Sequence, residues 1–488
     1  MGHVGGVERG QATMFPQSLD ECIGEDNSVR FIDAFVASLN LAELGFVHAA
    51  TQATGRPPYD PGDLLRLYLY GYLNRVRSSR ALEKETRRNV EAMWLLRKLT
   101  PDFKTIADFR ADNRAVLTRV CKEFVALCKR LDLFGGELVA VDGSKFRASN
   151  SRERLFTEAK LAERLKHIEE QIRGYLEELD RNDQQQAPER ALSREELQAR
   201  IAQLTERRQC YSALQATMEQ QQLRQIALTD PDARLMPQSS SQGGGTVVAY
   251  NVQTVVDAKH KLIVTHEVTT EGTDQRQLTN MAMQAQAALG VERMEVVADK
   301  GYYDGDEVAA CAAAGISAYI AKPHNSSKSL KAGRFGKPDF TYDAAHDRYR
   351  CPAGEWLRYR FTATQQQGRK LKHYYTSAAA CARCELRSRC TDRLEGVRQV
   401  TRLVNEEALE AMAQRVAAAP QKLKLRKQLV EHPFGTLKRP WNQGYFLMRS
   451  LAKVRAEMSL SVLAYNLRRV LNILGTQPLI SALAAQTL

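Results

Sequence analysis

The sequence predicts an α/β protein that is built around a mixed β-sheet. Two short apolar runs support this prediction, and each is followed by an aspartate: Leu138–Val141 precedes Asp142, and Met294–Ala298 precedes Asp299. β-rich runs bounded by glycine and polar residues are typical of central strands, and open α/β sheets place their sites at the carboxyl ends of strands. A third observation is the alternation of strand-like and helix-like segments that follows. At 488 residues, the chain is long enough for about three domains.

Residues 1–134 are predicted to form a helical domain. Helical patterns run from Phe31 to Arg130, and helix starts are indicated where Asp60 precedes Pro61 and at Thr105. Six basic residues between those starts occupy a turn and the helix after Ser79. They could serve a helix-turn-helix-like contact with DNA or form an ordinary solvated face; they are Arg75, Arg77, Arg80, Lys84, Arg87 and Arg88.

The predicted sheet is assembled from two parts of the chain, residues 135–154 and 225–325. Besides the two strands that precede the aspartates, strands and a helix follow in the order strand, strand, helix and strand. Their ranges are Thr246–Val256, Leu262–Val268, Gln275–Leu289 and Ile316–Ala321. Residues 401–488 add long helices, predicted at Glu407–Lys427 and Ala452–Leu474.

Between the two parts of the sheet, residues 155–224 are predicted to form a helical hairpin. Apolar residues alternate by four and three along both halves, which is the spacing of a coiled-coil seam. After a polar break, Ser193 and Glu196 form a capping box that starts the second helix. The hairpin could serve dimerisation, contact DNA ends or act as a packing arm.

Residues 326–400 contain four of the nine cysteines. The close pair Cys381 and Cys384 has the spacing of half a zinc site, and Cys351 with Cys390 could complete a tetrahedral thiolate site. Because this second pair is split in the sequence, reduced packing cysteines and a redox pair remain alternatives to a zinc-ribbon-like insert with one structural Zn²⁺. The odd number of cysteines and the lack of a signal-peptide core at Met1–Gly10 predict reduced thiols in the cytoplasm.

One acidic residue stands alone in the most basic stretch of the chain. Between Gln421 and Arg455, Glu431 is opposed by nine lysines and arginines. Such a surface suits phosphate, and an acid within it would weaken a purely electrostatic grip on nucleic acid. We therefore interpret Glu431 as a ligand that holds a cation, with a surface glutamate paired to Lys427 or Lys438 as the alternative.

Three sequence blocks resemble a known family. They are Val-Asp-Gly-Ser-Lys at Val141–Lys145, Ala-Asp-Lys-Gly-Tyr at Ala298–Tyr302 and Val-Glu-His-Pro-Phe-Gly-Thr-Leu-Lys at Val430–Lys438. These blocks look like the signatures of bacterial insertion-sequence transposases of the DDE class, in the branch named insertion sequence eleven-eighty-two. The resemblance covers nearly the whole chain and implies a ribonuclease-H-like catalytic core behind a DNA-binding amino-terminal domain. One departure concerns Lys424 and Lys427, which stand where related transposases often carry Tyr and Arg.

The resemblance implies a function for these residues. Asp142, Asp299 and Glu431 would be catalytic and would hold two Mg²⁺ (or Mn²⁺) ions, because hard cations prefer oxygen ligands and two-metal sites drive phosphodiester chemistry. The enzyme would cut insertion-sequence ends and join the 3′ hydroxyls to target DNA. Phosphate contacts are expected from Lys438, which matches a lysine of the family, and from Lys427, Arg426, Lys424 and Lys300.

Composition is consistent with double-stranded DNA as the partner, both terminal inverted repeats and target. The net charge is +13 with a pI near 9.3, and an apolar run long enough to cross a membrane is not expected. We expect a homodimer on DNA, associated with the bacterial nucleoid in the cytoplasm. Two other functions remain open: a non-catalytic zinc-ribbon DNA-binding regulator, and a metal-dependent nuclease that does not join strands.

Overall fold

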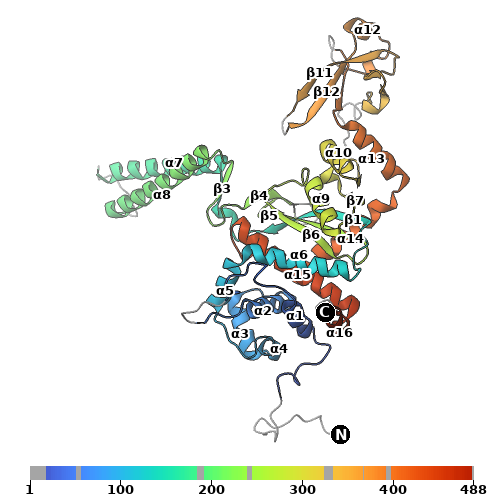
Figure 1. Ribbon diagram of the computed structural model, residues 1–488. Coiled ribbons are helices and arrows are strands. Elements are labelled where there is room, and N and C mark those ends of the chain that lie inside the picture. The colour runs from blue at the N-terminus through green and yellow to red at the C-terminus, as the bar shows by residue number, and fades with distance from the viewer. Residues whose placement is uncertain are drawn as a thin grey trace, which may run out of the picture.

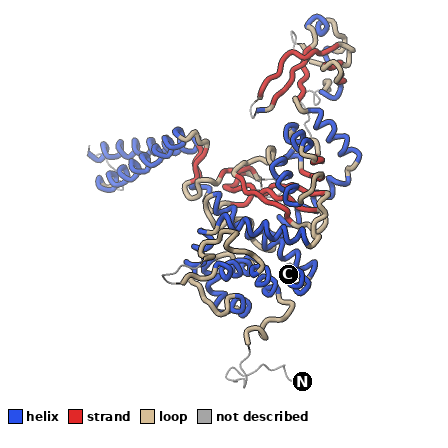
Figure 2. Tube along the Cα trace, viewed as in Figure 1, coloured by secondary structure: helices blue, strands red, loops and turns tan. Residues whose placement is uncertain are grey.

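The computed structural model describes residues 18–50, 57–183, 192–238, 244–323, 333–365, 368–391 and 397–485. Its architecture is mixed α/β (Figure 1). A helical bundle from the amino-terminal part packs below the central sheet, a pair of long helices projects to one side, and a second, smaller sheet lies beyond the opposite end (Figure 2). None of the helices in the described ranges is both long and apolar enough to cross a lipid bilayer.

Six helices form the bundle, and their starts follow from local capping. The Asp60 side chain accepts a hydrogen bond from the Gly62 amide at 2.7 Å, so the predicted start of α2 is found. The predicted start near Thr105 is wrong, because the Asp102 carboxylate accepts from the Lys104 and Thr105 amides at 2.8 and 3.0 Å. The bounds are α1 Ser28–Ala37, α2 Pro61–Leu73, α3 Ser79–Arg88, α4 Val90–Leu95, α5 Phe103–Asp112 and α6 Arg114–Arg130.

The bundle is joined to the carboxyl-terminal helices by a buried ion pair. Arg77 is 7% exposed, and its Nη1 lies 3.3 Å from Oε1 of the fully buried Glu457. The Glu457 carboxylate also accepts hydrogen bonds from the backbone amides of Leu447 and Met448. Arg77 therefore belongs to the interior and not to an exposed basic face. Glu457 lies on α15, Leu451–Leu474, which is followed by α16, Thr476–Ala484.

The central sheet places the first strand in its middle. The hydrogen-bonded order is β4-β5-β1-β7-β8, and β6 pairs with β5 beside β4. β5 runs antiparallel to β1, whereas β7 and β8 run parallel to it. The predicted order of three strands, a helix and two further strands is found. The bounds are β1 Leu138–Arg147, β4 Arg234–Pro237, β5 Thr246–Asp257, β6 Ile263–Thr269, α9 Leu278–Leu289, β7 Met294–Ala298, α10 Gly305–Ala313 and β8 Ile316–Ile320.

Helices cover both faces of this sheet. Val139 and Val141 of β1 point to the large core that includes α6, α9 and α15, whereas Ala140 packs on the other face with Leu429 and Val430 of α14 (Gln421–Lys438). Successive side chains of a strand alternate between faces. Even-numbered positions of β1 at this point therefore face α14, and this alternation decides where Asp142 points.

The predicted helix Glu407–Lys427 is wrong as a single element. The chain forms α13, Glu406–Ala418, and then α14, Gln421–Lys438, with a break at Ala419 and Pro420. Proline has no amide donor and disfavours helical geometry in the residue before it. Ala419 accordingly leaves the helical region, with φ −137° and ψ 61°.

A pair of long helices leaves the sheet region and returns to it. α7, Glu158–Asp183, and α8, Arg194–Gln220, lie side by side, and α8 begins at the predicted capping box. The Ser193 amide donates to the Glu196 carboxylate at 3.0 Å, and the Glu196 amide donates to the Ser193 hydroxyl at 3.2 Å. At the base of the pair, β2 (Leu155–Thr157) and β3 (Gln225–Ala227) form a short antiparallel ribbon.

The cysteine-containing part of the chain forms the second sheet, which is antiparallel with the order β13-β12-β11-β10-β9. One face carries a small core of Phe340, Tyr349, Leu357, Tyr374 and Val400. Its elements are β9 Thr341–Asp343, β10 Arg348–Arg350, β11 Trp356–Thr364, β12 Lys370–Tyr375, α12 Ala378–Ala382 and β13 Gln399–Leu403.

Candidate functional site

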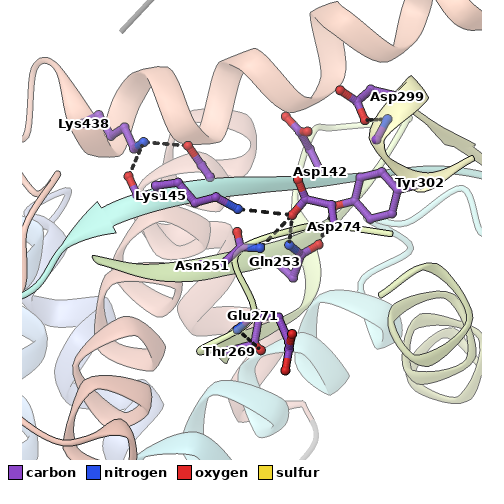
Figure 3. A network of polar contacts seen from close by, with 12 residues as sticks. Asp142, Lys145, Asn251, Gln253, Thr269, Glu271, Asp274, Asp299, Tyr302 and Lys438 are labelled. Carbon is purple, nitrogen blue, oxygen red and sulfur yellow. Dashed lines mark hydrogen bonds and ion pairs between the residues drawn. The ribbon is translucent and has the colours of Figure 1, made fainter. Parts of the chain in front are cut away.

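Asp142 and Asp299 occupy equivalent positions on neighbouring parallel strands. The ladder between β1 and β7 ends at the pair Ala140 and Val297, and each aspartate lies two residues further along its strand direction. The prediction that the first strand ends at Asp142 is wrong, because β1 continues to Arg147 by pairing with β5. Figure 3 nevertheless shows both carboxylates near the point where β1 and β7 separate, and the charge of Asp299 raises the pKa of Asp142.

The Asp142 carboxyl is mostly buried beside other acids. Burial raises its pKa to about 7, the Arg426 guanidinium opposes this rise, and Asp299 and Asp274 add to it. The Arg426 Nη1 atom lies 3.5 Å from Asp142 Oδ1. This contact follows from strand alternation, because Asp142 shares the α14-facing side of β1 with Ala140. A negative charge on Asp142 is therefore costly unless a cation lies nearby.

Asp299 caps the short 3-10 helix η3, Lys300–Tyr302. Its Oδ1 accepts a hydrogen bond from the Gly301 amide at 2.7 Å. A Cβ atom at Gly301 would lie 2.8 Å from that same oxygen, so the glycine allows the carboxylate to fold back over the turn. Within the block Ala298–Tyr302, the glycine at position 301 is thus explained by the capping contact of Asp299.

A third aspartate near the pair was not among the predicted site residues. Oδ1 of Asp274 accepts hydrogen bonds from Asn251 Nδ2 at 2.7 Å and Gln253 Nε2 at 2.6 Å, and Lys145 Nζ lies 3.6 Å away. The Tyr302 hydroxyl donates to the other end of the Gln253 amide. Figure 3 shows this network beneath Asp142. One sequence signal could have indicated it, because Asn251 and Gln253 are alternating polar residues in an otherwise apolar strand.

Gly143 is required by the same network. A Cβ atom there would approach both Asp274 Oδ1 and Gln253 Nε2 to 2.3 Å. Any larger residue would displace the side chains that hold Asp274. The glycine after Asp142 therefore serves the packing of the site and is not a turn residue, since it lies within β1 opposite Gln253.

Helix α14 carries the predicted basic residues, and they have different surroundings. Lys422 pairs with Glu295, and Arg426 pairs with Asp142. Lys438 donates to the Ser144 hydroxyl at 2.6 Å and to the Lys145 carbonyl at 2.8 Å, and burial lowers its pKa to about 8. Lys424 and Lys427 are exposed.

Glu431 is exposed on α14. Among the residues that the structure describes, no group of three or more His, Cys, Asp or Glu side chains is arranged to hold a metal ion. A further acid, Asp274, raises the pKa of Asp142 through its charge. The structure thus brings together two of the three predicted carboxylates.

An open cleft of about 700 Å³ lies beside the acids. Asp274, Lys300 and Gly301 line it from the central sheet, and Arg369 lines it from the second sheet. Lys300, predicted as a phosphate contact, is exposed at this cleft. Acidic and basic side chains both line the cleft, among them Asp274, Asp304, Lys300 and Arg369.

The four clustered cysteines are free thiols that line one cavity of about 30 Å³. Burial raises the pKa of the Cys390 thiol, and the other three thiols add to that effect. The Sγ atom of Cys381 lies 2.8 Å from the Thr376 hydroxyl. The residues predicted to form a zinc site therefore converge, although their side chains are not arranged as ligands.

Two family models match the chain. Residues 17–112 match a transposase domain (DUF772), and residues 350–471 match a transposase DDE domain. These matches support an insertion-sequence DDE transposase. The DDE domain also suggests a ribonuclease-H-like fold, and transposases act on DNA. The second match contains Glu431 and the four cysteines, whereas Asp142 and Asp299 lie outside both matched segments. No curated protein and no solved structure matches the chain.

Proposed function

We propose that this chain is a DNA transposase that cuts the ends of its insertion sequence and joins the 3′ hydroxyls to target DNA. The observation that carries the proposal is the pairing of Asp142 and Asp299 where β1 and β7 separate, under a helix that bears cations. Phosphodiester chemistry needs this combination, because carboxylates hold divalent ions and basic side chains hold the phosphates.

Asp142 and Asp299 fit the donor chemistry of Mg²⁺ or Mn²⁺. Both supply carboxylate oxygens, and the mutual repulsion of Asp142, Asp274 and Asp299 is what a bound cation would relieve. A pair of such ions supplies activation of the attacking oxygen and stabilisation of the leaving oxygen. Glu431 is proposed as the third ligand only on the resemblance of its sequence block, whereas Asp274 is the further acid whose charge raises the pKa of Asp142.

The cationic side chains of α14 complete the proposed site. Arg426 balances the charge of Asp142, and Lys438 is held at the far end of β1 by Ser144 and the Lys145 carbonyl. A lysine that is fixed by two hydrogen bonds can donate its third proton to a phosphate oxygen. We therefore propose Lys438 as a contact to the DNA backbone near the cleaved bond.

The test is incubation of the purified protein with duplexes from the ends of its own genetic element, with Mg²⁺ or without divalent ions. Mg²⁺-dependent cuts at those ends, followed by joining of the 3′ ends to a second duplex, would support the proposal. Cleavage without joining would reduce the function to that of a nuclease. Binding without cleavage would favour the non-catalytic regulator. A gel-shift series on paired ends would also test the proposed homodimer.

Salt dependence should separate the lysines of α14 that face DNA from those that do not. Lys424→Ala and Lys427→Ala should each lower the magnitude of the log-log salt slope of duplex binding by about 0.9, the value for one phosphate contact. Lys422→Ala should leave the slope unchanged because its ammonium is paired with Glu295. Fluorescence anisotropy at several salt concentrations measures the slopes. Equal slopes for wild type and the Lys424/Lys427 double variant would exclude this surface from DNA binding.

We further propose that Cys351, Cys381, Cys384 and Cys390 bind one structural Zn²⁺. The four cysteines line one cavity of about 30 Å³, and the second sheet has a core of only a few buried residues. Small modules of this kind often need a metal or disulfide to be stable. Binding would require the thiols to lose their protons and turn toward the cavity.

Protein purified under reducing conditions should contain about one zinc per chain, as in other four-cysteine sites. Cys384→Ser should remove the zinc and make the second sheet sensitive to proteolysis, because structural zinc contributes folding energy. Elemental analysis and limited digestion measure the two effects. The control is Cys210→Ser, an exposed cysteine on α8, which should retain the zinc. Wild-type protein without zinc would contradict the proposal.

A further inference from the structure

The second sheet has one face that its own core does not use. Tyr349, Leu357 and Tyr374 point to the core, so the residues that alternate with them point away from it. This outer face is defined by seven residues of β10, β11 and β12: Arg348, Arg350, Trp356, Arg358, Phe361, His373 and Tyr375.

Aromatic rings on the outer face are stacked and partly open to solvent. Phe361 is 45% exposed and stacks on His373 with ring centroids 4.6 Å apart and an interplanar angle of 14°. Tyr375 lies 6.2 Å from Phe361. An irregularity in the pairing of β11 with β12 lies next to Phe361. Adjacent exposed rings are more informative than single exposed side chains, because contiguous apolar patches mark interaction surfaces.

Positive charge surrounds these rings. Arg350, Arg358 and Arg360 are exposed, and the Arg360 guanidinium lies 5.4 Å from the centre of the Tyr375 ring. Asp343 is the only acidic residue of the five described strands β9 to β13, and its carboxylate is paired with Arg348. The outer face thus combines aromatic rings with the exposed guanidinium groups of Arg350 and Arg358.

We propose that the outer face binds single-stranded DNA, with bases stacked on Phe361 and Tyr375 and phosphates held by the arginines. Aromatic rings stack on bases only where those bases are not already stacked within a duplex, and arginines follow the backbone without regard to sequence. This assignment rests on the proposed function, because a strand that is cut at one site and joined at another must separate from its original partner near the cut.

The position of the second sheet supports this partner. Arg369, which precedes β12, lies 3.5 Å from Asp304 at the start of α10, so the second sheet is attached beside the central one. The cleft next to Asp274 is lined by residues of both sheets. A strand released near the acids could therefore pass along the cleft toward the rings.

The experiment measures binding of the full-length chain, without Mg²⁺, to a fluorescent oligothymidine, to a matched duplex and to an abasic oligonucleotide with the same number of phosphates. Phe361→Ala and Tyr375→Ala should each weaken oligothymidine binding roughly 5- to 100-fold, since a stacked base contributes ~1–3 kcal/mol. Duplex binding should change little. Phe361→Trp should restore oligothymidine affinity because it keeps the stacking surface.

The matched control is Tyr359→Ala, which removes an aromatic ring that is 44% exposed but lies against Tyr374 on the core side of the same strand. This variant should bind oligothymidine like wild type. Equal affinity of wild type for the abasic and oligothymidine probes would overturn the proposal, and so would an unchanged affinity in the Phe361/Tyr375 double variant. Losses of equal size for duplex and oligothymidine would assign the face to general charge attraction and would also overturn it.

The same preparations separate this inference from the proposed function. If the protein cuts duplex ends with Mg²⁺ but does not bind oligothymidine, only the proposal that the outer face binds single-stranded DNA is refuted. Oligothymidine binding that depends on Phe361, in a protein that never cuts DNA, would refute the transposase and leave the outer face as a single-strand binding surface.

Discussion

Asp142→Asn is expected to abolish DNA cleavage and to stabilise the protein when no divalent ion is added. Loss of an essential ligand in a two-metal site should reduce cleavage by at least about a thousandfold. The same change removes a buried negative charge that lies near Asp274 and Asp299, so the free energy of unfolding at pH 8 should rise by about 1–2 kcal/mol. Cleavage gels and thermal denaturation measure the two effects.

The stabilising effect of Asp142→Asn should depend on pH in a defined direction. The pKa of Asp142 is raised to about 7 in the folded protein from an ordinary value of 3.8. Ionisation therefore costs stability above the ordinary pKa, and the full cost is present above about pH 7. The gain in the variant should shrink as the pH falls from 8 toward 4. A gain that is independent of pH would contradict this explanation.

Glu431→Gln provides the contrast to Asp142→Asn. Glu431 is proposed as a ligand but is exposed, so this variant should lose cleavage without a gain in stability. If Glu431→Gln cuts DNA at the wild-type rate, the third ligand must be sought elsewhere, and Asp274 is the first alternative. Retained cutting by Asp142→Asn would end the assignment of the whole site.

Glu457→Ala is expected to destabilise the protein by about 3–5 kcal/mol, the usual cost of breaking a buried ion pair from one side. The change would leave Arg77 buried without its carboxylate and the amides of Leu447 and Met448 without their acceptor. Chemical denaturation measures the effect. The control is Glu170→Ala, which breaks the exposed pair with Lys166 and should change stability by less than about 0.5 kcal/mol. A loss below about 1 kcal/mol for Glu457→Ala would show that the bundle is held by other contacts.

Local rules in the sequence were enough for much of the fold. Apolar runs located β1 and β7, and capping chemistry located the starts of α2 and α8. Two helix predictions were wrong, namely the start of α5 and the continuity of α13 with α14, and local sequence features explain both. Asp102 is a stronger cap than Thr105, and Pro420 divides a helix that periodicity alone made continuous. The strand that carries Asp142 runs on because pairing with β5, far along the chain, holds it in place.

The candidate site was less accessible from the sequence, because its contacts arise between distant segments. Asp274 is held beside β1 by Asn251 and Gln253 of β5, and nothing near Asp274 in the sequence indicates this. The partners of the basic residues could not be predicted from the sequence either. On the same helix, Lys422 forms an ion pair with Glu295 whereas Lys424 is exposed. The charge pattern correctly predicted a basic helix, whereas the contacts of each lysine depend on tertiary packing.

The helix pair α7 and α8 begins and ends at points that are adjacent in space, because Leu155 pairs with Ala227 and Thr157 with Gln225 in the ribbon beneath it. A helix pair inserted in this way lengthens the chain without moving β1 or β5. During evolution the arm could be extended, shortened or exchanged in one event, since neither β1 nor β5 needs to change its neighbours. The pair can therefore change in length without altering the order of strands in the central sheet.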